Sequence, residues 1–199
     1  MKGFAVIIVG YQGAGKSLLV KNTIKKVNHE RLRILDIYEE YLEFTNGQLQ
    51  YIDEEEDLID PDKFTDDMIH MKDKIFVAED ATFIFPHRGY DKRLVRAIVG
   101  KRHSGNVYFF LFHALQVIPT DVYMYSDEIW LLKTADKEDG LKDRYKGTNV
   151  IELWREVEKL PEFEWSEKQP VPIRDKHFKV MQIKKGKIDK TVTRTEPEI

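Results

Sequence analysis

The most constraining feature of this chain is a glycine-rich segment near its start, at residues 10–17. It reads GYQGAGKS and fits the phosphate-binding pattern G-x-x-x-x-G-K-[ST] at every fixed position. An apolar run of strand length precedes it at residues 4–9, and a helical pattern follows it from Leu18 onward. A strand, a glycine-rich loop and a helix in this order predict a site for the phosphates of a nucleoside triphosphate.

Each kind of residue in that loop has an expected role. The glycines let backbone N–H groups turn inward around a triphosphate, and the following helix adds the positive end of its dipole. Lys16 is expected to reach the β- and γ-phosphates of ATP, and the Ser17 hydroxyl to ligate Mg²⁺. The residues expected to bind the nucleotide are Gly10, Gln12, Gly13, Ala14, Gly15, Lys16, Ser17 and Leu18.

Composition narrows the class of protein further. The 199 residues are 42% hydrophobic, enough for one core with room for an appendage, and they include no cysteine. No apolar run approaches the roughly 20 residues of a membrane span, and the apolar start is interpreted as a buried strand. We therefore expect a soluble, intracellular protein. The net charge of −3 gives no overall attraction to nucleic acid, so any such contact must come from local basic patches.

The order of apolar runs predicts an α/β fold. Four runs besides residues 4–9 have the β-branched and aromatic content of strands buried on both faces, and helical stretches separate them. Strands alternating with helices predict a three-layer phosphate-loop NTPase core with a mostly parallel sheet. The four strands are expected at 32–37, 75–78, 107–112 and 128–132, and the helices at 17–28, 62–71 and 92–100.

The pattern weakens after about residue 135. The stretch 133–147 is highly charged and is interpreted as a loop, and it precedes an amphipathic helix at 151–160 and a proline-containing connector at 161–172. A hairpin is expected to pair 177–183 with 188–193. The predicted division is a core at 1–135 and a small helix-plus-hairpin appendage at 136–199.

Two acidic residues end the predicted strand at 75–78. In a phosphate-loop enzyme, the first acid at such a strand end holds the Mg²⁺ shell, and a second can orient or deprotonate the attacking water. We therefore expect Glu79 to face the metal and Asp80 to be the catalytic carboxylate. The order is inverted relative to the usual Asp-Glu pair. The alternative is a strand that simply ends in solvated acids.

Polar residues after the strand at 107–112 are candidate sensors of the γ-phosphate. His113 follows the strand directly and is the first candidate, and Gln116 is the second. The alternative for His113 is a plain hydrogen-bonded residue at a strand end.

Several arginines lie in and around the predicted helix at 92–100. They either form a solvated helix face or include an arginine that enters a neighbouring subunit's site and stabilises transition-state charge. Arg102 is our candidate, because it lies in the turn before the strand at 107–112, which we expect at the sheet edge near the phosphates.

Together these features resemble the HerA/FtsK branch of phosphate-loop ATPases. The resemblance is greatest to the small genome-packaging ATPases of viruses with internal membranes, and Zot-like morphogenesis proteins of filamentous phages are a neighbouring group. It covers about residues 1–135. The segments that carry it, beyond the phosphate loop, are the D-x-x-x-E-Y element at 36–41, Glu79-Asp80-Ala81, the turn at 102–106, His113, Pro119 and 132–134. His113 stands where the family usually has a glutamine.

The resemblance implies an ATP-hydrolysing motor that translocates double-stranded DNA as a ring, with a hexamer expected. It also implies a capsid or membrane component of a virion as a partner, and a place in the host cytoplasm or the virion. The candidate DNA-contacting residues are Lys92, Arg93, Arg96, Lys101, Arg102, Lys184, Lys185 and Lys187.

Two alternatives belong to other classes. A small-molecule or nucleoside kinase shares the phosphate loop, but the adjacent Glu79-Asp80 pair argues against it because a kinase must exclude the hydrolytic water. A Zot-like assembly ATPase that acts on protein would normally carry a membrane span, which this sequence lacks.

Overall fold

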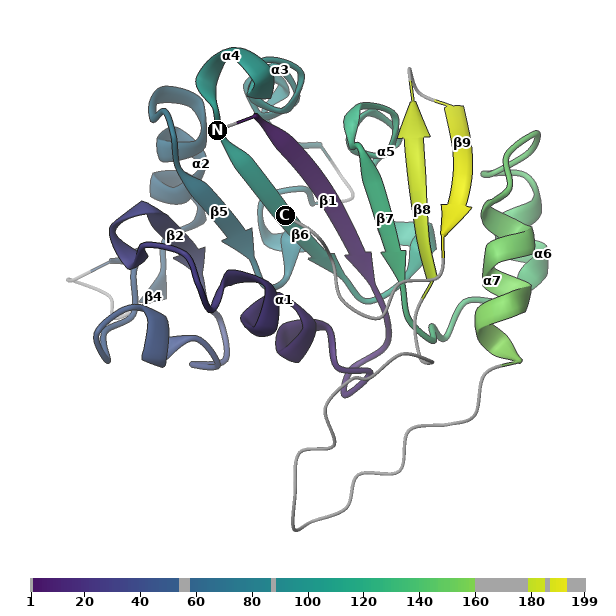
Figure 1. Cartoon of the computed structure of the whole chain (residues 1–199), viewed down its shortest axis with the longest axis horizontal. Helices are drawn as coiled ribbons and strands as arrows, with labels where there is room; N and C mark the ends of the chain where they lie inside the picture. Colours follow the sequence, from purple (N-terminus) through teal and green to yellow (C-terminus); the bar gives the residue numbers. More distant parts are fainter. Residues whose placement is uncertain (1, 54–57, 87–88, 160–178, 185–186, 193–199) are drawn as a thin grey trace, which may run out of the picture.

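The computed structural model describes residues 2–53, 58–86, 89–159, 179–184 and 187–192, the last two ranges as backbone only. Its centre is a seven-stranded sheet in the order β2-β5-β6-β1-β7-β8-β9 (Figure 1). The first five strands are parallel, and β8 and β9 add an antiparallel hairpin beside β7. The strands are β1 (Phe4–Val9), β2 (Leu32–Leu35), β5 (Ile75–Ala78), β6 (Val107–Phe112), β7 (Glu128–Leu131), β8 (Lys179–Lys184) and β9 (Lys187–Val192).

Helices cover both faces of this sheet. The α-helices are α1 (Lys16–Ile24), α2 (Pro61–His70), α3 (Lys92–Val99), α4 (Lys101–Ser104), α5 (Thr120–Tyr125), α6 (Glu138–Lys142) and α7 (Val150–Glu158). The short 3-10 helices are η1 (His29–Arg31), η2 (Leu42–Phe44), η3 (Ala81–Phe83) and η4 (Leu115–Val117), and β3 (Ile52–Asp53) pairs with β4 (Leu58–Ile59) in a separate ribbon.

Alternating side chains of the strands divide the core into two halves. Val6 and Ile8 of β1 pack on one face with Leu19, Val20 and Ile24 of α1. Ala5, Ile7 and Val9 of β1 belong to a larger cluster that includes apolar residues of α2, α3, α5, α6 and α7. The result is the three-layer α/β fold with a mostly parallel sheet that the sequence predicts, and the fold-class prediction is confirmed.

The C-terminal part of the chain packs against the same core. Leu141 of α6 and Leu153 and Val157 of α7 are fully or almost fully buried in the larger cluster. The expected helix and hairpin are present, and β8 extends the central sheet by pairing with β7. The expected charged loop contains α6. The division at residue 135 remains a prediction, and the connector at 161–172 lies outside the described residues.

One expected strand ends earlier than its apolar pattern suggests. The sequence pattern runs to residue 37, but β2 ends at Leu35. Asp36 turns the chain there, because its carboxylate accepts hydrogen bonds from the N–H groups of Glu40 at 3.0 Å and Tyr41 at 2.7 Å. Such local hydrogen bonds compete with a strand ladder.

Candidate nucleotide-binding and hydrolysis site

The phosphate loop joins the carboxyl end of β1 to the start of α1. Gly13 and Gly15 have φ values of 82° and 93°, a left-handed conformation that glycine adopts without strain. Gly10 meets a different need, since a Cβ there would lie 3.0 Å from the Cβ atoms of both Ala14 and Leu132. The sequence therefore folds into a loop whose N–H groups can surround an anion.

Two neighbouring strands fix the position of this loop. The Gly10 N–H donates to the carbonyl of Phe112 at the end of β6, at 3.1 Å. The Tyr11 N–H donates to the carbonyl of Lys133, just after β7, at 2.8 Å. The loop thus lies between the carboxyl ends of β6 and β7, where parallel α/β sheets place their ligands.

Lys16 is folded back onto the loop. Its Nζ donates to the carbonyls of Gly10 at 2.8 Å and Tyr11 at 3.2 Å, and the residue is only 7% exposed. Burial lowers the pKa of Lys16 to about 8, although the nearby Asp80 and Glu79 charges raise it. Triphosphate charge at the loop would favour the protonated ammonium.

Glu79 follows β5 and faces Ser17. The Ser17 hydroxyl donates to Glu79 Oε1 at 3.4 Å, and the N–H groups of Ile37 and Tyr38 donate to Oε2 at 3.2 Å and 3.3 Å. Burial, a hydrogen bond that protonated Glu79 donates to Asp36, and the charge of Glu40 raise the pKa of Glu79 to about 8. The carboxylates of Asp36, Glu40 and Glu79 thus gather at this point of the site.

These surroundings fit a bound Mg²⁺ ion. The Ser17 hydroxyl and the Glu79 carboxylate are the hard oxygen ligands that Mg²⁺ prefers, and Mg²⁺ usually takes few protein ligands beside phosphate and water. No group of three or more histidine, cysteine, aspartate or glutamate side chains that could hold a metal ion occurs among the described residues. The buried Tyr41 hydroxyl nearby lacks a hydrogen-bond partner within the described part of the chain.

Asp80 and His113 face each other beside Lys16. Asp80 Oδ2 lies 3.4 Å from His113 Nε2, and His113 Nδ1 lies 3.3 Å from Lys16 Nζ. Burial and the Lys16 charge hold the pKa of His113 below its usual value, against the raising effect of Asp80. A neutral imidazole can accept from Lys16 through Nδ1 and donate to Asp80 through Nε2.

Asp80 is also held by Thr82, two residues further along the chain after β5. Its Oδ1 accepts from the N–H of Thr82 at 3.0 Å and from the Thr82 hydroxyl at 2.6 Å, which caps η3. Asp80 is 7% exposed. The second carboxylate therefore contacts the imidazole and Thr82, whereas the first contacts Ser17.

A hollow of about 470 Å³ lies at the carboxyl edge of the sheet and is lined by Lys16, Ser17, Glu79 and His113 but not by Asp80. It includes three residues that sequence reasoning did not assign to the site, namely Lys21, Tyr38 and Glu40. The last two belong to the segment after β2 that carries the D-x-x-x-E-Y element. The residues that line the hollow are Gln12, Gly13, Gly15, Lys16, Ser17, Leu18, Lys21, Tyr38, Glu40, Glu79 and His113.

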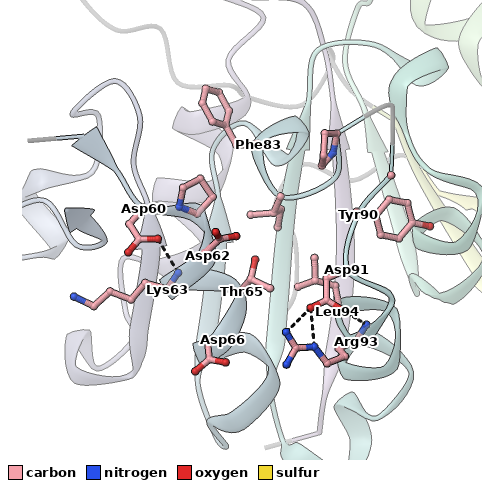
Figure 2. A pocket seen from close by; sticks show the side chains of 14 residues that line it. Asp60, Asp62, Lys63, Thr65, Asp66, Phe83, Tyr90, Asp91, Arg93 and Leu94 are labelled. Carbon is pink, nitrogen blue, oxygen red and sulfur yellow. Dashed lines mark hydrogen bonds and ion pairs between the residues drawn. The ribbon is translucent and has the colours of Figure 1, made fainter. Parts of the chain in front are cut away.

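A larger hollow, of about 670 Å³, lies elsewhere, between the starts of α2 and α3 and next to η3 (Figure 2). Asp60, Asp66 and Asp91 line it, and Arg93 is held there by an ion pair with Asp91 at 2.7 Å. None of the phosphate-loop residues reaches it. The phosphate-loop geometry, and not cavity size, therefore identifies the nucleotide site.

Two sequence expectations about this edge are wrong. Gln116 does not reach the hollow, because its side chain packs against Gly140 of α6. Arg102 lies in α4, before β6 begins, and so stands at the amino edge of the sheet, opposite the phosphate loop (Figure 1). Residues that precede a parallel strand cannot lie at its carboxyl end.

The expected basic cluster on α3 and α4 is smaller than its sequence suggests. Lys101 is 7% exposed, donates to the Tyr125 carbonyl at 2.8 Å and pairs with Asp127 at 3.2 Å. It therefore supports the fold and is not available to a ligand. Lys185, at the expected hairpin tip, lies outside the described residues.

The sheet order, the phosphate loop and the acids after β5 define a phosphate-loop NTPase fold. The sequence matches no family model, and no curated protein matches it. Solved structures of viral genome-packaging NTPases are similar over nearly the whole chain. The genome-packaging NTPase B204 from Sulfolobus turreted icosahedral virus 2, in complex with sulfate, has a TM-score of 0.68 at 17% identity and covers 100% of this chain and 98% of its own.

Two further structures give the same result. B204 from the same virus in complex with ATP-gammaS has a TM-score of 0.67 at 17% identity, with coverage of 98% and 99%. B204 from Sulfolobus turreted icosahedral virus, described as a DNA-packaging ATPase, has a TM-score of 0.63 at 16% identity, with coverage of 95% and 97%. The expected resemblance to viral packaging ATPases is therefore confirmed at the level of the fold. No described helix has the length and apolar character needed to cross a membrane.

Proposed function

We propose that this protein hydrolyses ATP and uses the energy to translocate double-stranded DNA during viral genome packaging. The observation that carries the proposal is the convergence of Lys16, Ser17, Glu79, Asp80 and His113 at one sheet edge. The fold shared with NTPases named for DNA packaging, one of them in complex with ATP-gammaS, supports the nucleotide and the process.

In this proposal the phosphate loop binds ATP and Lys16 leaves the loop carbonyls to contact the β- and γ-phosphates. Ser17 and Glu79 hold Mg²⁺, which would neutralise phosphate charge. Asp80 accepts the proton of the attacking water. His113, between Lys16 and Asp80, contacts the γ-phosphate or the water and so registers whether the γ-phosphate is present.

A cation from a second subunit would complete the site. Among the residues that the structure describes, no arginine lines the hollow. Arginine stabilises charge on a transferring phosphoryl group, and ring motors can supply it from a neighbour. Arg102 stands at the opposite edge of its own sheet, so any role in hydrolysis must be in trans, which fits a head-to-tail ring, with a hexamer expected.

DNA contacts would use basic residues of α3, α4 and the hairpin, since each phosphate contact adds salt-sensitive affinity. Lys92, Arg96 and Arg102 remain candidates, whereas the paired Lys101 does not. A capsid or membrane component of the virion would anchor the ring, either in the host cytoplasm or on the particle.

The test is ATP turnover with and without double-stranded DNA, measured beside the oligomeric mass. We expect DNA to stimulate phosphate release in an assembled ring, and Lys16→Ala to abolish nearly all turnover. Turnover that needs a small-molecule acceptor, in a protein that stays monomeric with ATP and DNA, would replace this proposal with a kinase.

A further inference from the structure

A buried carboxylate from the C-terminal part of the chain holds the segment that follows His113. Asp136 lies after β7 and is 8% exposed. Its Oδ2 accepts from the N–H of Leu115 at 2.7 Å, and its Oδ1 from the N–H of Gln116 at 3.2 Å. The first N–H groups of a helix lack internal partners, so Asp136 caps η4 from outside. This helix begins two residues after His113.

Further contacts from the same region hold the other side of η4. The Tyr145 hydroxyl donates to the Leu115 carbonyl at 2.7 Å, and Arg144 donates to the Ile118 carbonyl. Gly140 of α6 lies so close to the Gln116 side chain that an added Cβ would overlap its amide. Both backbone groups of Leu115 are therefore bonded to residues beyond 135.

Asp136 is itself tied to α7. The Thr134 hydroxyl accepts from the Asp136 N–H at 3.4 Å and from Trp154 Nε1 at 3.2 Å. Glu138 of α6 pairs with Arg155 of α7 at 2.6 Å. The position of η4 is thus linked to a helix that packs on β7 and β8.

The imidazole of His113 needs such support. Its side chain is 38% exposed, and its contacts to Lys16 and Asp80, at 3.3 Å and 3.4 Å, are long for hydrogen bonds. Its backbone runs between two fixed points, Phe112 in β6 and Leu115 on Asp136. Because the Leu115 end depends on Asp136, a shift of η4 would move the ring relative to the γ-phosphate.

We propose that Asp136 is a positioning residue for His113, and that the segment after residue 135 thereby takes part in ATP turnover. The inference rests on the proposed function, in which His113 senses the γ-phosphate. It assigns a role in ATP turnover to the segment after residue 135, which carries none of the motifs that the sequence shows.

The first test is Asp136→Asn, which keeps the side-chain shape but replaces one acceptor oxygen with a donor amide. Because Asp136 would act only through the position of His113, we expect kcat to fall by up to about tenfold, with the KM for ATP within about twofold of wild type. The matched control is Asp127→Asn, because Asp127 also accepts a backbone N–H, from Ala5 at 2.9 Å, but at the amino edge of the sheet. The control is expected to lose stability with kcat unchanged.

The second readout does not need turnover. The NMR signals of the His113 ring, recorded without nucleotide, should shift in Asp136→Asn and stay in place in Asp127→Asn. Tyr145→Phe removes only the hydrogen bond from the Tyr145 hydroxyl to the Leu115 carbonyl and should shift the same signals by less. This variant provides the test if Asp136→Asn does not fold. Unmoved ring signals, or moved signals with wild-type kcat, overturn the inference. A wild-type protein without ATPase activity contradicts the proposed function instead, while the ring signals still report whether Asp136 sets the position of His113.

Discussion

Two adjacent carboxylates end the same strand, and the structure gives them different surroundings. Glu79 contacts Ser17 and two N–H groups of the segment after β2, whereas Asp80 contacts His113 and Thr82. A strand alternates its side chains, so neighbours at its end point to different places. The inverted order of the acids relative to the usual pair thus leaves Glu79 beside Ser17, where the proposed function expects Mg²⁺.

We expect Asp80→Asn to bind ATP normally but to hydrolyse it about 100-fold or more slowly, since removing a general base commonly costs this much. Glu79→Gln should instead weaken Mg²⁺-dependent ATP binding, because it removes a charged oxygen beside Ser17. Titration calorimetry with and without Mg²⁺, beside phosphate release, separates the two effects. Equal loss of binding in both variants would mean that the roles are assigned wrongly.

We expect His113 to make hydrolysis sensitive to acid. Its pKa lies below the ordinary 6.5, so the neutral ring contributes stability above pH 6.5 that is lost as the pH falls through the folded-state pKa. Protonation also removes the acceptor that faces Lys16. We expect His113→Gln to retain hydrolysis within about tenfold and to flatten the decline of hydrolysis as the pH falls below about 6.5. If the pH profiles of kcat for the variant and wild type coincide there, another group causes the decline.

At the scale of helices and strands, Lys101 is an example of a charged residue that the fold uses internally. It lies in α4 and ties that helix to the carbonyl of Tyr125 and the carboxylate of Asp127. Asp127 in turn accepts the N–H of Ala5 in β1. The start of β1, α4 and the end of α5 are therefore held by one ion pair.

Lys101→Ala is expected to lower the free energy of unfolding by about 2 kcal/mol, less than the loss of a fully buried pair because Asp127 keeps 23% exposure. Arg102→Ala, one residue along, loses no side-chain hydrogen bond or ion pair within the described part of the chain and should change the free energy of unfolding by less than about 0.5 kcal/mol. Urea unfolding of both variants checks this contrast. Equal free energies of unfolding for the two variants would mean that the Lys101–Asp127 ion pair contributes nothing to stability.

The sequence predicts the site better than it predicts the surroundings of the site. The phosphate loop and the apolar runs are local patterns, and the residues they indicate, Lys16, Glu79, Asp80 and His113, lie together at one edge of the sheet, while their roles stay predictions. The expectation that Arg102 lies at the phosphate edge is wrong, although its position before a parallel strand already indicates the amino edge. Asp136 was missed because its role depends on residues about 20 positions away, with no local signal.

At the scale of the whole molecule, Arg102 and the nucleotide site lie at opposite edges of one sheet. A role in hydrolysis therefore requires two subunits. We expect Arg102→Ala to bind ATP but hydrolyse it slowly when assembled. Mixing it with Lys16→Ala should restore part of the rate, because the Lys16 variant brings an intact arginine to a neighbour with an intact phosphate loop.

The measurement is the rate of the mixture against each variant alone, under conditions where subunits exchange. A mixture no faster than its parts would mean that Arg102 does not act on a neighbouring subunit. Two Lys16→Ala preparations mixed together serve as the control for dilution.

We expect the hairpin of β8 and β9 also to keep the central sheet from pairing with strands of other chains. β7 is parallel to β1 on one side and bonded to the hairpin on the other, so removing residues 160–199 would leave its other row of N–H and C=O groups unpaired. Ile129 and Leu131 of this strand are apolar, and such an edge is a template for pairing with further chains. The outermost strand, β9, carries Lys187, Asp189 and Lys190 instead, and charges of this kind discourage edge-to-edge growth.

We expect a chain that stops at residue 159 to form β-rich aggregates that bind thioflavin, while the full-length protein under the same conditions does not. The hairpin would then be the element that stops the central sheet from adding strands of other chains.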